Sequence, residues 1–224
     1  MPLDLPKPII YLITSGSTTN KTTPDSPEFS QLLTLIKAAV AAQIPLIQIR
    51  EKALTTRVLY ALTRRAVGIA HGSSTRVLVN DRFDVALGAG ADGVQLTAQS
   101  LSARVVRRAT SSRFVISVST HSVHEAEEAR SGDADLIVFG PVFETESKRS
   151  FGPPQGLSKL GDIAAAVDGT PVIAIGGIGV ENVRECLRHG ASGIAAIRLL
   201  NDSNSLPATV AAIREAGATS KSDE

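Results

Sequence analysis

The chain has 224 residues, of which 43% are hydrophobic, and this is enough apolar material for one large core in a single domain. Its 23 basic and 22 acidic residues give a formal net charge of +1 with no long run of either sign, so we expect no nucleic acid and no membrane among its partners. One cysteine, Cys186, excludes a disulfide framework, and no secretory signal or membrane-spanning stretch is apparent, so we expect a cytoplasmic protein.

Short β-branched runs alternate with longer segments of helical period along the whole chain. The pattern predicts eight strands, at Pro8 to Thr14, Leu46 to Arg50, Arg76 to Val79, Gly93 to Leu96, Phe114 to Val118, Leu136 to Phe139, Pro171 to Ile175 and Gly193 to Ile197. It predicts helices at Glu28 to Gln43, Thr55 to Ala70, Ser102 to Ala109, Val123 to Arg130, Leu157 to Val167, Val180 to His189 and Leu206 to Ala216, and at most a short one at Arg82 to Gly88. Such alternation is typical of a parallel sheet.

Two architectures fit this alternation, a doubly wound open sheet and a closed (β/α)₈ TIM barrel. Eight evenly spaced strands in this length favour closure, as does the near-repeat of residues 91–94 in residues 191–194. We therefore predict one α/β domain over residues 1–224, with the barrel from about 8 to 216. The small, polar residues 217–224 are predicted to form a flexible tail.

In a TIM barrel the functional residues follow the carboxyl ends of the strands. After the second strand, Gln48, Arg50 and Lys52 alternate along the chain and so point in one direction, an arrangement that suits an anion. A solvated strand edge paired with Glu51 explains the same residues equally well. After the third strand, Asp81 can bind Mg²⁺, but Asn80 and Asp81 on their own are better explained as helix caps.

The later strands also end in polar residues. His121 follows the fifth strand and is a candidate acid/base, although a helix cap is slightly favoured without further context. After the sixth strand, a long loop carries potential phosphate donors at Thr145, Ser147 and Lys148. Gly176 and Gly177 after the seventh strand, with Arg198 after the eighth, predict a phosphate site at a helix N-terminus.

Taken together, these segments resemble the thiamine phosphate synthase and TenI superfamily from Tyr11 to about Leu200. The resemblance implies action on thiazole phosphate, by one of two activities. The matching segments are Tyr11-Leu12-Ile13-Thr14, Gln48-Ile49-Arg50-Glu51-Lys52, Asn80-Asp81-Arg82-Phe83-Asp84-Val85-Ala86, Ala91-Asp92-Gly93-Val94, Ser119-Thr120-His121, Gly140-Pro141-Val142-Phe143 with Thr145 and Lys148, and Ala174-Ile175-Gly176-Gly177-Ile178.

The synthase activity joins a pyrimidine methyl pyrophosphate to thiazole phosphate with loss of pyrophosphate and help from Mg²⁺. Resemblance to it implies that Gln48, Arg50 and Lys52 bind pyrophosphate, Asn80 the pyrimidine and Asp81 Mg²⁺. It also places Ser119 near the reacting centre, and Thr145, Ser147 and Lys148 on phosphate oxygens.

The TenI branch is a thiazole tautomerase, which moves a proton and needs no cofactor. The synthase pattern has Gly-Val-His-Leu-Gly-Gln-x-Asp-Leu after the fourth strand, whereas residues 93–101 here place Gln95 at the histidine and Ser100 at the second metal carboxylate. Because a neutral hydroxyl is a poor ligand for a hard cation, this departure favours TenI. His121 is then the general acid/base, Gly176 and Gly177 hold the thiazole phosphate, and Arg50 lies near the substrate carboxylate.

The tautomerase is therefore our leading interpretation, with catalytic roles for His121, Arg50 and Ser119. The synthase is the alternative, in which Asp81 binds Mg²⁺, and an inactive thiazole or thiamine phosphate binding protein is the second alternative. Gln48 and Lys52 are more typical of the synthase, and Arg198 replaces a serine that both branches usually carry. In every case we expect a small phosphorylated substrate and a homo-oligomer.

Overall fold

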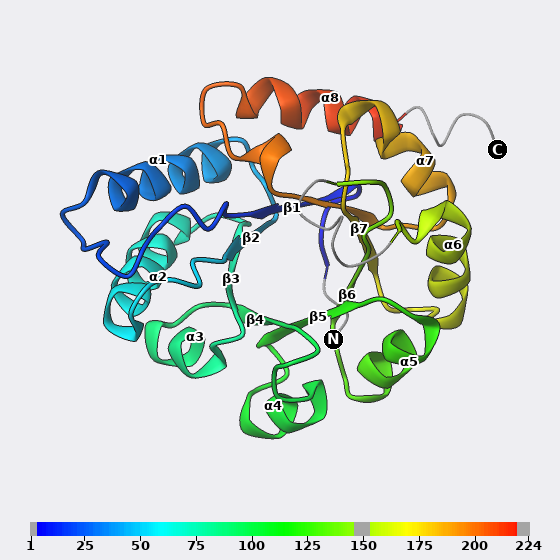
Figure 1. The fold of residues 1–224 in the computed structure, drawn as a ribbon, viewed down its shortest axis with the longest axis horizontal. Helices are drawn as coiled ribbons and strands as arrows, with labels where there is room; N and C mark the ends of the chain where they lie inside the picture. Colours follow the sequence, from blue (N-terminus) through cyan, green and yellow to red (C-terminus); the bar gives the residue numbers. More distant parts are fainter. Residues whose placement is uncertain (1–3, 146–152, 219–224) are drawn as a thin grey trace.

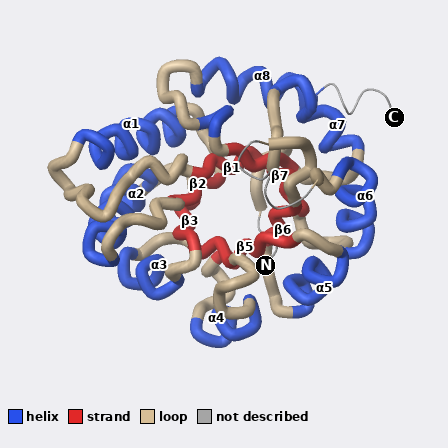
Figure 2. The backbone as a smooth tube through the Cα atoms, in the orientation of Figure 1, coloured by secondary structure: helices blue, strands red, loops and turns tan. Residues whose placement is uncertain are grey.

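The computed structural model describes residues 4–145 and 153–218. Its eight strands are all parallel and form a closed barrel, in which β1 completes the ring by pairing with β8. The predicted TIM barrel is confirmed, and Figures 1 and 2 show the strands as an inner ring with the helices around it. The strands are β1 (Ile9–Ile13), β2 (Leu46–Ile49), β3 (Arg76–Asn80), β4 (Gly93–Leu96), β5 (Val115–Thr120), β6 (Leu136–Phe139), β7 (Val172–Ile175) and β8 (Gly193–Ala196).

A helix follows each strand and covers the outside of the barrel (Figure 1). The α-helices are α1 (Pro27–Ala41), α2 (Thr56–Ala70), α3 (Phe83–Ala89), α4 (Ala103–Ala109), α5 (Val123–Ser131), α6 (Gly156–Ala166), α7 (Val183–Arg188) and α8 (Leu206–Ala218). Two short 3₁₀ helices, η2 (Val180–Asn182) and η3 (Arg198–Leu200), follow β7 and β8. Within the described ranges no helix is both long and apolar enough to span a membrane.

Alternate residues of each strand divide the buried side chains into two layers. Residues such as Ile9 and Tyr11 of β1 fill the barrel interior, whereas Ile10 and Leu12 pack outward against the helices. Towards the carboxyl ends of β2 to β5 the interior side chains become polar, at Gln48, Asn80, Gln95 and Ser117. The apolar layer therefore forms a floor beneath the end of the barrel where function is expected.

Glycine at the start of β4 and β8 accounts for the near-repeat in the sequence. A Cβ atom at Gly93 would lie 2.2 Å from the carbonyl oxygen of Val115, and one at Gly193 would lie 2.0 Å from that of Ile9. Both glycines therefore let neighbouring strands approach closely, at β4·β5 and at the β8·β1 closure. Close packing of neighbouring strands therefore explains the near-repeat.

Two predicted helices differ from the structure for a physical reason. The predicted helix Val180 to His189 is divided into η2 and the six-residue α7, because Asn182 folds back and its side chain accepts from the Gly179 N–H. Helix α8 extends to Ala218, two residues into the predicted tail. Gly217 is buried against Pro8, where a Cβ atom would lie 2.8 Å from the proline ring, and this packing continues the helix.

Candidate active site

The candidate site lies at the carboxyl ends of β2, β3, β4 and β5. Gln48 is almost fully buried inside the barrel, and Arg50, two residues later on the same side of the chain, is half-buried. The Arg50 N–H donates to Thr14 Oγ1 over 2.8 Å, which fastens the end of β2 to the end of β1. Lys52 follows in an exposed position. Lys52 lies beyond the end of β2, so the common direction expected for all three side chains stays a prediction.

Glu51, which separates Arg50 from Lys52, anchors the loop between β1 and α1. Its carboxylate is 2% exposed and accepts from the Gly16 N–H at 3.0 Å, the Thr18 N–H at 3.2 Å and the Thr18 hydroxyl at 2.8 Å. Gly16 lies against Arg50, since a Cβ atom there would be 3.5 Å from Arg50 Nη1. Glu51 thus holds the loop beside the guanidinium, and a solvated strand edge is not the explanation of this segment.

Asp81 is the acidic centre of the site, and its backbone has a left-handed φ of +59°. Asn80 Nδ2 donates to Asp81 Oδ2 at 2.6 Å, Thr97 Oγ1 donates to Oδ1 at 3.0 Å, and the Ser100 hydroxyl donates to the same Oδ1. The loop after β4 therefore meets the end of β3 at this carboxylate. Asp81 does not cap α3, whose N-cap residue is Arg82.

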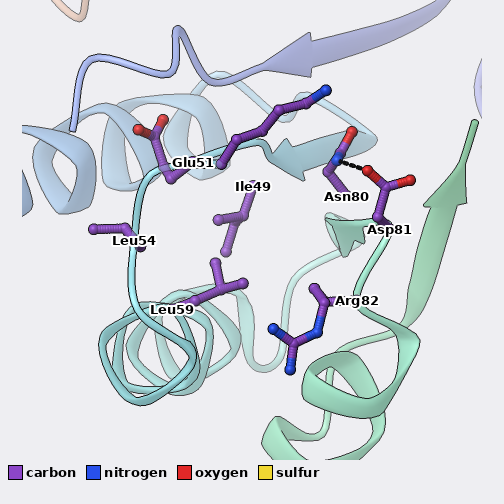
Figure 3. Close-up of a pocket in the computed structure, with 8 residues that line it drawn as sticks. Ile49, Glu51, Leu54, Leu59, Asn80, Asp81 and Arg82 are labelled. Carbon is purple, nitrogen blue, oxygen red and sulfur yellow. Dashed lines mark hydrogen bonds between the residues drawn. The ribbon is translucent and has the colours of Figure 1, made fainter. Parts of the chain in front are cut away.

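A cavity of about 260 Å³ opens beside these residues. Figure 3 shows Leu54 and Leu59 on one side of it and Asn80, Asp81 and Arg82 on the other. Ile49, Glu51 and Lys52 complete the lining. Apolar walls with a few convergent polar groups are typical of a small-molecule site.

Arg82 is held by its neighbours on the far side of this cavity. Its guanidinium makes two hydrogen bonds to Asp84, at 2.8 and 2.6 Å, and a third to Thr56 at 2.9 Å. The hydrogen bond to Arg82 keeps the pKa of the exposed Asp84 carboxyl below its ordinary value. Arg82 therefore ties the start of α3 to the start of α2.

Beneath the site, polar side chains cross the barrel interior in one connected network. Gln48 Nε2 donates to the Tyr11 hydroxyl, which donates to Gln95 Oε1, both over 3.2 Å. Ser117 also donates to Gln95 Oε1, at 2.8 Å, and Gln95 Nε2 donates to Ser119 Oγ at 3.1 Å. Burial raises the pKa of the Tyr11 phenol well above its ordinary value, so this hydroxyl keeps its proton.

His121 stands at the end of β5, and its ring is fixed by the next strand. Its Nδ1 lies within hydrogen-bonding distance of the Gly140 carbonyl oxygen. Since a carbonyl only accepts, Nδ1 carries a proton, and in a neutral ring Nε2 is then the acceptor. The His121 N–H donates to Glu125, and Ser122 rather than His121 caps α5.

The loop after β6 packs on the two glycines that follow β7. A Cβ atom at Gly176 would lie 2.5 Å from Pro141 Cβ, and one at Gly177 would lie 2.5 Å from the Glu144 carbonyl oxygen. Both glycines have positive φ, at +97° and +65°. Their first role is thus to admit this loop, while the predicted phosphate site remains a prediction.

The remaining predicted residues follow β6 and β8, at the same end of the barrel. Thr145 is half-buried at the end of the described part of this loop, and Ser147 and Lys148 lie outside the described residues. Arg198 is exposed on η3 at the end of β8. Nearby, Asn201 donates to the carbonyl oxygens of Ile13 and Ile197, each at 2.7 Å, and so ties the ends of β1 and β8 together.

Comparison with known proteins places the chain in a family. A family model described as thiamine monophosphate synthase matches residues 11–200. The chain belongs to this family. It is 38% identical to the thiamine-phosphate synthase of Methanoregula boonei over 187 residues, which cover 84% of this chain and 86% of that protein. It is 35% identical to the thiamine-phosphate synthase of Roseiflexus castenholzii over 189 residues, covering 84% and 79%.

A solved structure supports the same placement of this thiamine monophosphate synthase family member. The fold matches thiamine phosphate pyrophosphorylase from Pyrococcus furiosus with a TM-score of 0.76 and 28% sequence identity, over 95% of this chain and 97% of that one. The superfamily resemblance found from the sequence is therefore confirmed.

The preference for a tautomerase, an isomerase, is wrong. Relatives at 34 to 38% identity over most of both chains carry the name thiamine-phosphate synthase, which is a transferase activity. That preference depends on Ser100 as a lost metal ligand. In the structure Ser100 is a hydrogen-bond partner of the Asp81 carboxylate, so it still belongs to the same cluster. The loss of one negative charge at this position therefore does not distinguish a tautomerase from a synthase.

Several residues of this site were absent from the predicted set. Gln95 and Ser117 face the barrel interior, and alternation along the predicted strands gives their direction. Thr97 and Glu51 carry no comparable signal. Their partners, Asp81 for Thr97 and the loop residues Gly16 and Thr18 for Glu51, are 16 to 35 residues away in sequence and adjacent only in the folded chain.

Proposed function

We propose that this chain is a thiamine-phosphate synthase, which joins a pyrimidine methyl pyrophosphate to thiazole phosphate. In this reaction the bond from the pyrimidine methylene carbon to the pyrophosphate oxygen breaks, and a bond from that carbon to the thiazole nitrogen forms. The observation that carries the proposal is the similarity over most of both chains to relatives of that name. Its support from geometry is the convergence of Gln48, Arg50, Asn80, Asp81 and Ser119 at one end of the barrel.

The cationic residues of β2 suit the pyrophosphate. The Arg50 backbone N–H donates to Thr14 and its guanidinium lies against Gly16, and a guanidinium can donate two parallel hydrogen bonds to the oxygens of a pyrophosphate. Lys52 lines the cavity that also contains Asn80 and Asp81. In this proposal Arg50 and Lys52 hold the leaving group, Asn80 contacts the pyrimidine, and Ser119 lies near the reacting carbon.

The oxygen donors around Asp81 fit Mg²⁺ that binds together with a substrate phosphate. Mg²⁺ commonly takes one or two carboxylates, and phosphate oxygens and waters complete its shell. Asp81 supplies one carboxylate, with the hydroxyl oxygens of Thr97 and Ser100 beside it. Among the residues described, no three His, Cys, Asp or Glu side chains gather closely enough to hold a metal by themselves. When bound, Mg²⁺ neutralises charge on the departing pyrophosphate.

The test is pyrophosphate release by the purified protein with both substrates, in Mg²⁺ and in excess EDTA. We expect release that requires Mg²⁺ and a fall in kcat/KM of at least about 100-fold for Asp81→Asn, because the carboxylate proposed to bind the metal is lost. Asp162→Asn, an exposed change on α6, is the matched control and should remain active.

Two results contradict the proposal. Undiminished release in EDTA would exclude the Mg²⁺-dependent reaction. Tight calorimetric binding of thiazole phosphate without release of pyrophosphate would identify the chain as an inactive binding protein, the second alternative given above. Self-association, which we expected from the resemblance, stays a prediction that sedimentation of the same preparation tests.

A further inference from the structure

A polar network crosses the barrel interior from β2 to β5, and Gln95 on β4 is at its centre. Gln95 is 2% exposed, yet it makes four hydrogen bonds. Its Oε1 accepts from Tyr11 and Ser117, and its Nε2 donates to the Leu96 carbonyl oxygen at 3.2 Å and to Ser119 Oγ. The hydrogen-bonding capacity of this amide is therefore used completely.

The direction of these hydrogen bonds is fixed by one atom. The Leu96 carbonyl oxygen can only accept, so the nitrogen and not the oxygen of the Gln95 amide must face it. The same NH₂ group reaches Ser119 with its second hydrogen. Ser119 Oγ thus accepts a hydrogen bond from Gln95, and no residue in the described ranges accepts the hydrogen of the Ser119 hydroxyl.

We propose that Gln95 is a positioning residue, which fixes Ser119 as a hydrogen-bond donor toward the pyrophosphate leaving group. This inference rests on the proposed synthase function for the identity of the anion. A hydroxyl that already accepts from Gln95 directs its hydrogen elsewhere, and half-buried Ser119 lies at the same end of the barrel as the candidate anion residues. A donor aimed at an anionic oxygen in advance strengthens binding because no reorientation is needed.

The charge state of the network supports this role. Tyr11 keeps its proton because burial raises its pKa, and the other members are neutral amides and hydroxyls. Tyr11 gives its single hydrogen to Gln95 and so must accept from Gln48. A neutral network adds no repulsion to a pyrophosphate above it, whereas a carboxylate in place of the Gln95 amide would.

The experiment compares Gln95→Glu, Ser119→Ala and the double variant. Two quantities are measured for each, the Kd of inorganic pyrophosphate with Mg²⁺ by calorimetry and kcat for thiamine phosphate formation. A glutamate cannot donate to both Leu96 and Ser119, so the Ser119 hydroxyl turns towards it. We expect each single change to weaken pyrophosphate binding about 10-fold, the size of one hydrogen bond to a charged group.

The double variant separates positioning from general damage. In the Ser119→Ala background, Gln95→Glu should weaken binding clearly less than it does when Ser119 is present, since the hydroxyl that it controls is gone and only the repulsion by its charge remains. An equal effect in both backgrounds would show that Gln95 acts by charge or packing, and would overturn the inference. Gln95→Met, which carries no charge, should act only when Ser119 is present, and thermal unfolding of each variant verifies that it folds.

Two further variants complete the design. Ser117→Ala removes a partner from the opposite side of Gln95 and leaves the Leu96 contact, so binding should change by less than about 3-fold. Gln95→His should restore binding above the imidazole pKa, because one ring nitrogen donates to Ser119 while the other accepts. If the wild-type protein forms no thiamine phosphate but the variants change pyrophosphate binding as expected, the synthase proposal is refuted and the role of Gln95 stands.

Discussion

Replacement of Glu51 by glutamine isolates the contact that holds the β1–α1 loop beside Arg50. The two residues have nearly the same shape, so packing is preserved. Two of the three hydrogen bonds end on Oε2, from the N–H and hydroxyl of Thr18, and the third ends on Oε1, from the Gly16 N–H. A glutamine keeps its oxygen on the Thr18 pair and turns its NH₂ group towards the Gly16 N–H, where two donors then meet.

The expected cost follows from this count. One hydrogen bond to a buried carboxylate is lost, which is worth about 1.5–3 kcal/mol. The Gly16 amide should therefore exchange with solvent at least about 10-fold faster in Glu51→Gln, whereas the Thr18 amide changes little. Because Gly16 lies against the Arg50 guanidinium, KM for the pyrimidine pyrophosphate should rise about 10-fold, and KM for thiazole phosphate should stay constant.

Amide exchange by NMR and steady-state kinetics measure these quantities on the same preparations. Thr18→Val is the matched control, because it removes one hydroxyl from the same carboxylate without changing the charge. Unchanged exchange at Gly16 would refute the hydrogen-bond assignment. Faster exchange with an unchanged KM would refute the link between this loop and Arg50.

Three further changes test separate features. Ser100→Asp puts a second carboxylate beside Asp81, so without metal it should lower the free energy of unfolding by about 1 kcal/mol, and it should raise the affinity for Mg²⁺ about 10-fold. Unfolding with and without Mg²⁺ measures the first effect and calorimetry the second, and an unchanged affinity would contradict this metal site. Gly177→Ala should destabilise the fold by about 2–3 kcal/mol, measured by urea unfolding, because φ is +65° and the new Cβ atom would meet the Glu144 carbonyl oxygen. The control is Gly161→Ala, where the nearest atom is 3.8 Å away, and equal effects of the two changes would contradict this packing. Burial, and to a smaller extent the charge of the neighbouring Glu185, raises the pKa of the Cys186 thiol to about 12. At pH 8.5 the thiol is therefore protonated and should react with iodoacetamide only after unfolding, whereas rapid labelling of the native protein would contradict this burial.

The fold could be predicted because its signal is local. Strands of period two alternate with helices, and every predicted strand is present with its ends shifted by no more than two residues. The prediction of one helix over Val180 to His189 failed where a side chain bonds to the backbone just before it. The Asn182 side chain, which also donates to the Gly177 carbonyl oxygen, turns the first residues into a 3₁₀ helix.

The site was harder to predict because its residues act through contacts between distant segments. Ser100 appeared to be an absent ligand, yet its hydroxyl meets a carboxylate 19 positions earlier in the chain. Pairing of Glu51 with Arg50 and Lys52 explained that segment as well as an anion site did, but the Glu51 carboxylate is buried in a loop contact. No local pattern distinguishes these roles from their alternatives, and so the sequence could place the rim of the site without deciding its chemistry.

The most direct test of the central claim is ³¹P NMR of the purified protein with thiazole phosphate, pyrimidine methyl pyrophosphate and Mg²⁺. We expect the signals of inorganic pyrophosphate and thiamine phosphate to grow in equal amounts, and neither to grow when EDTA is present. Substrate signals that persist unchanged with Mg²⁺, in a preparation that binds thiazole phosphate, would contradict the assignment of synthase activity to this chain.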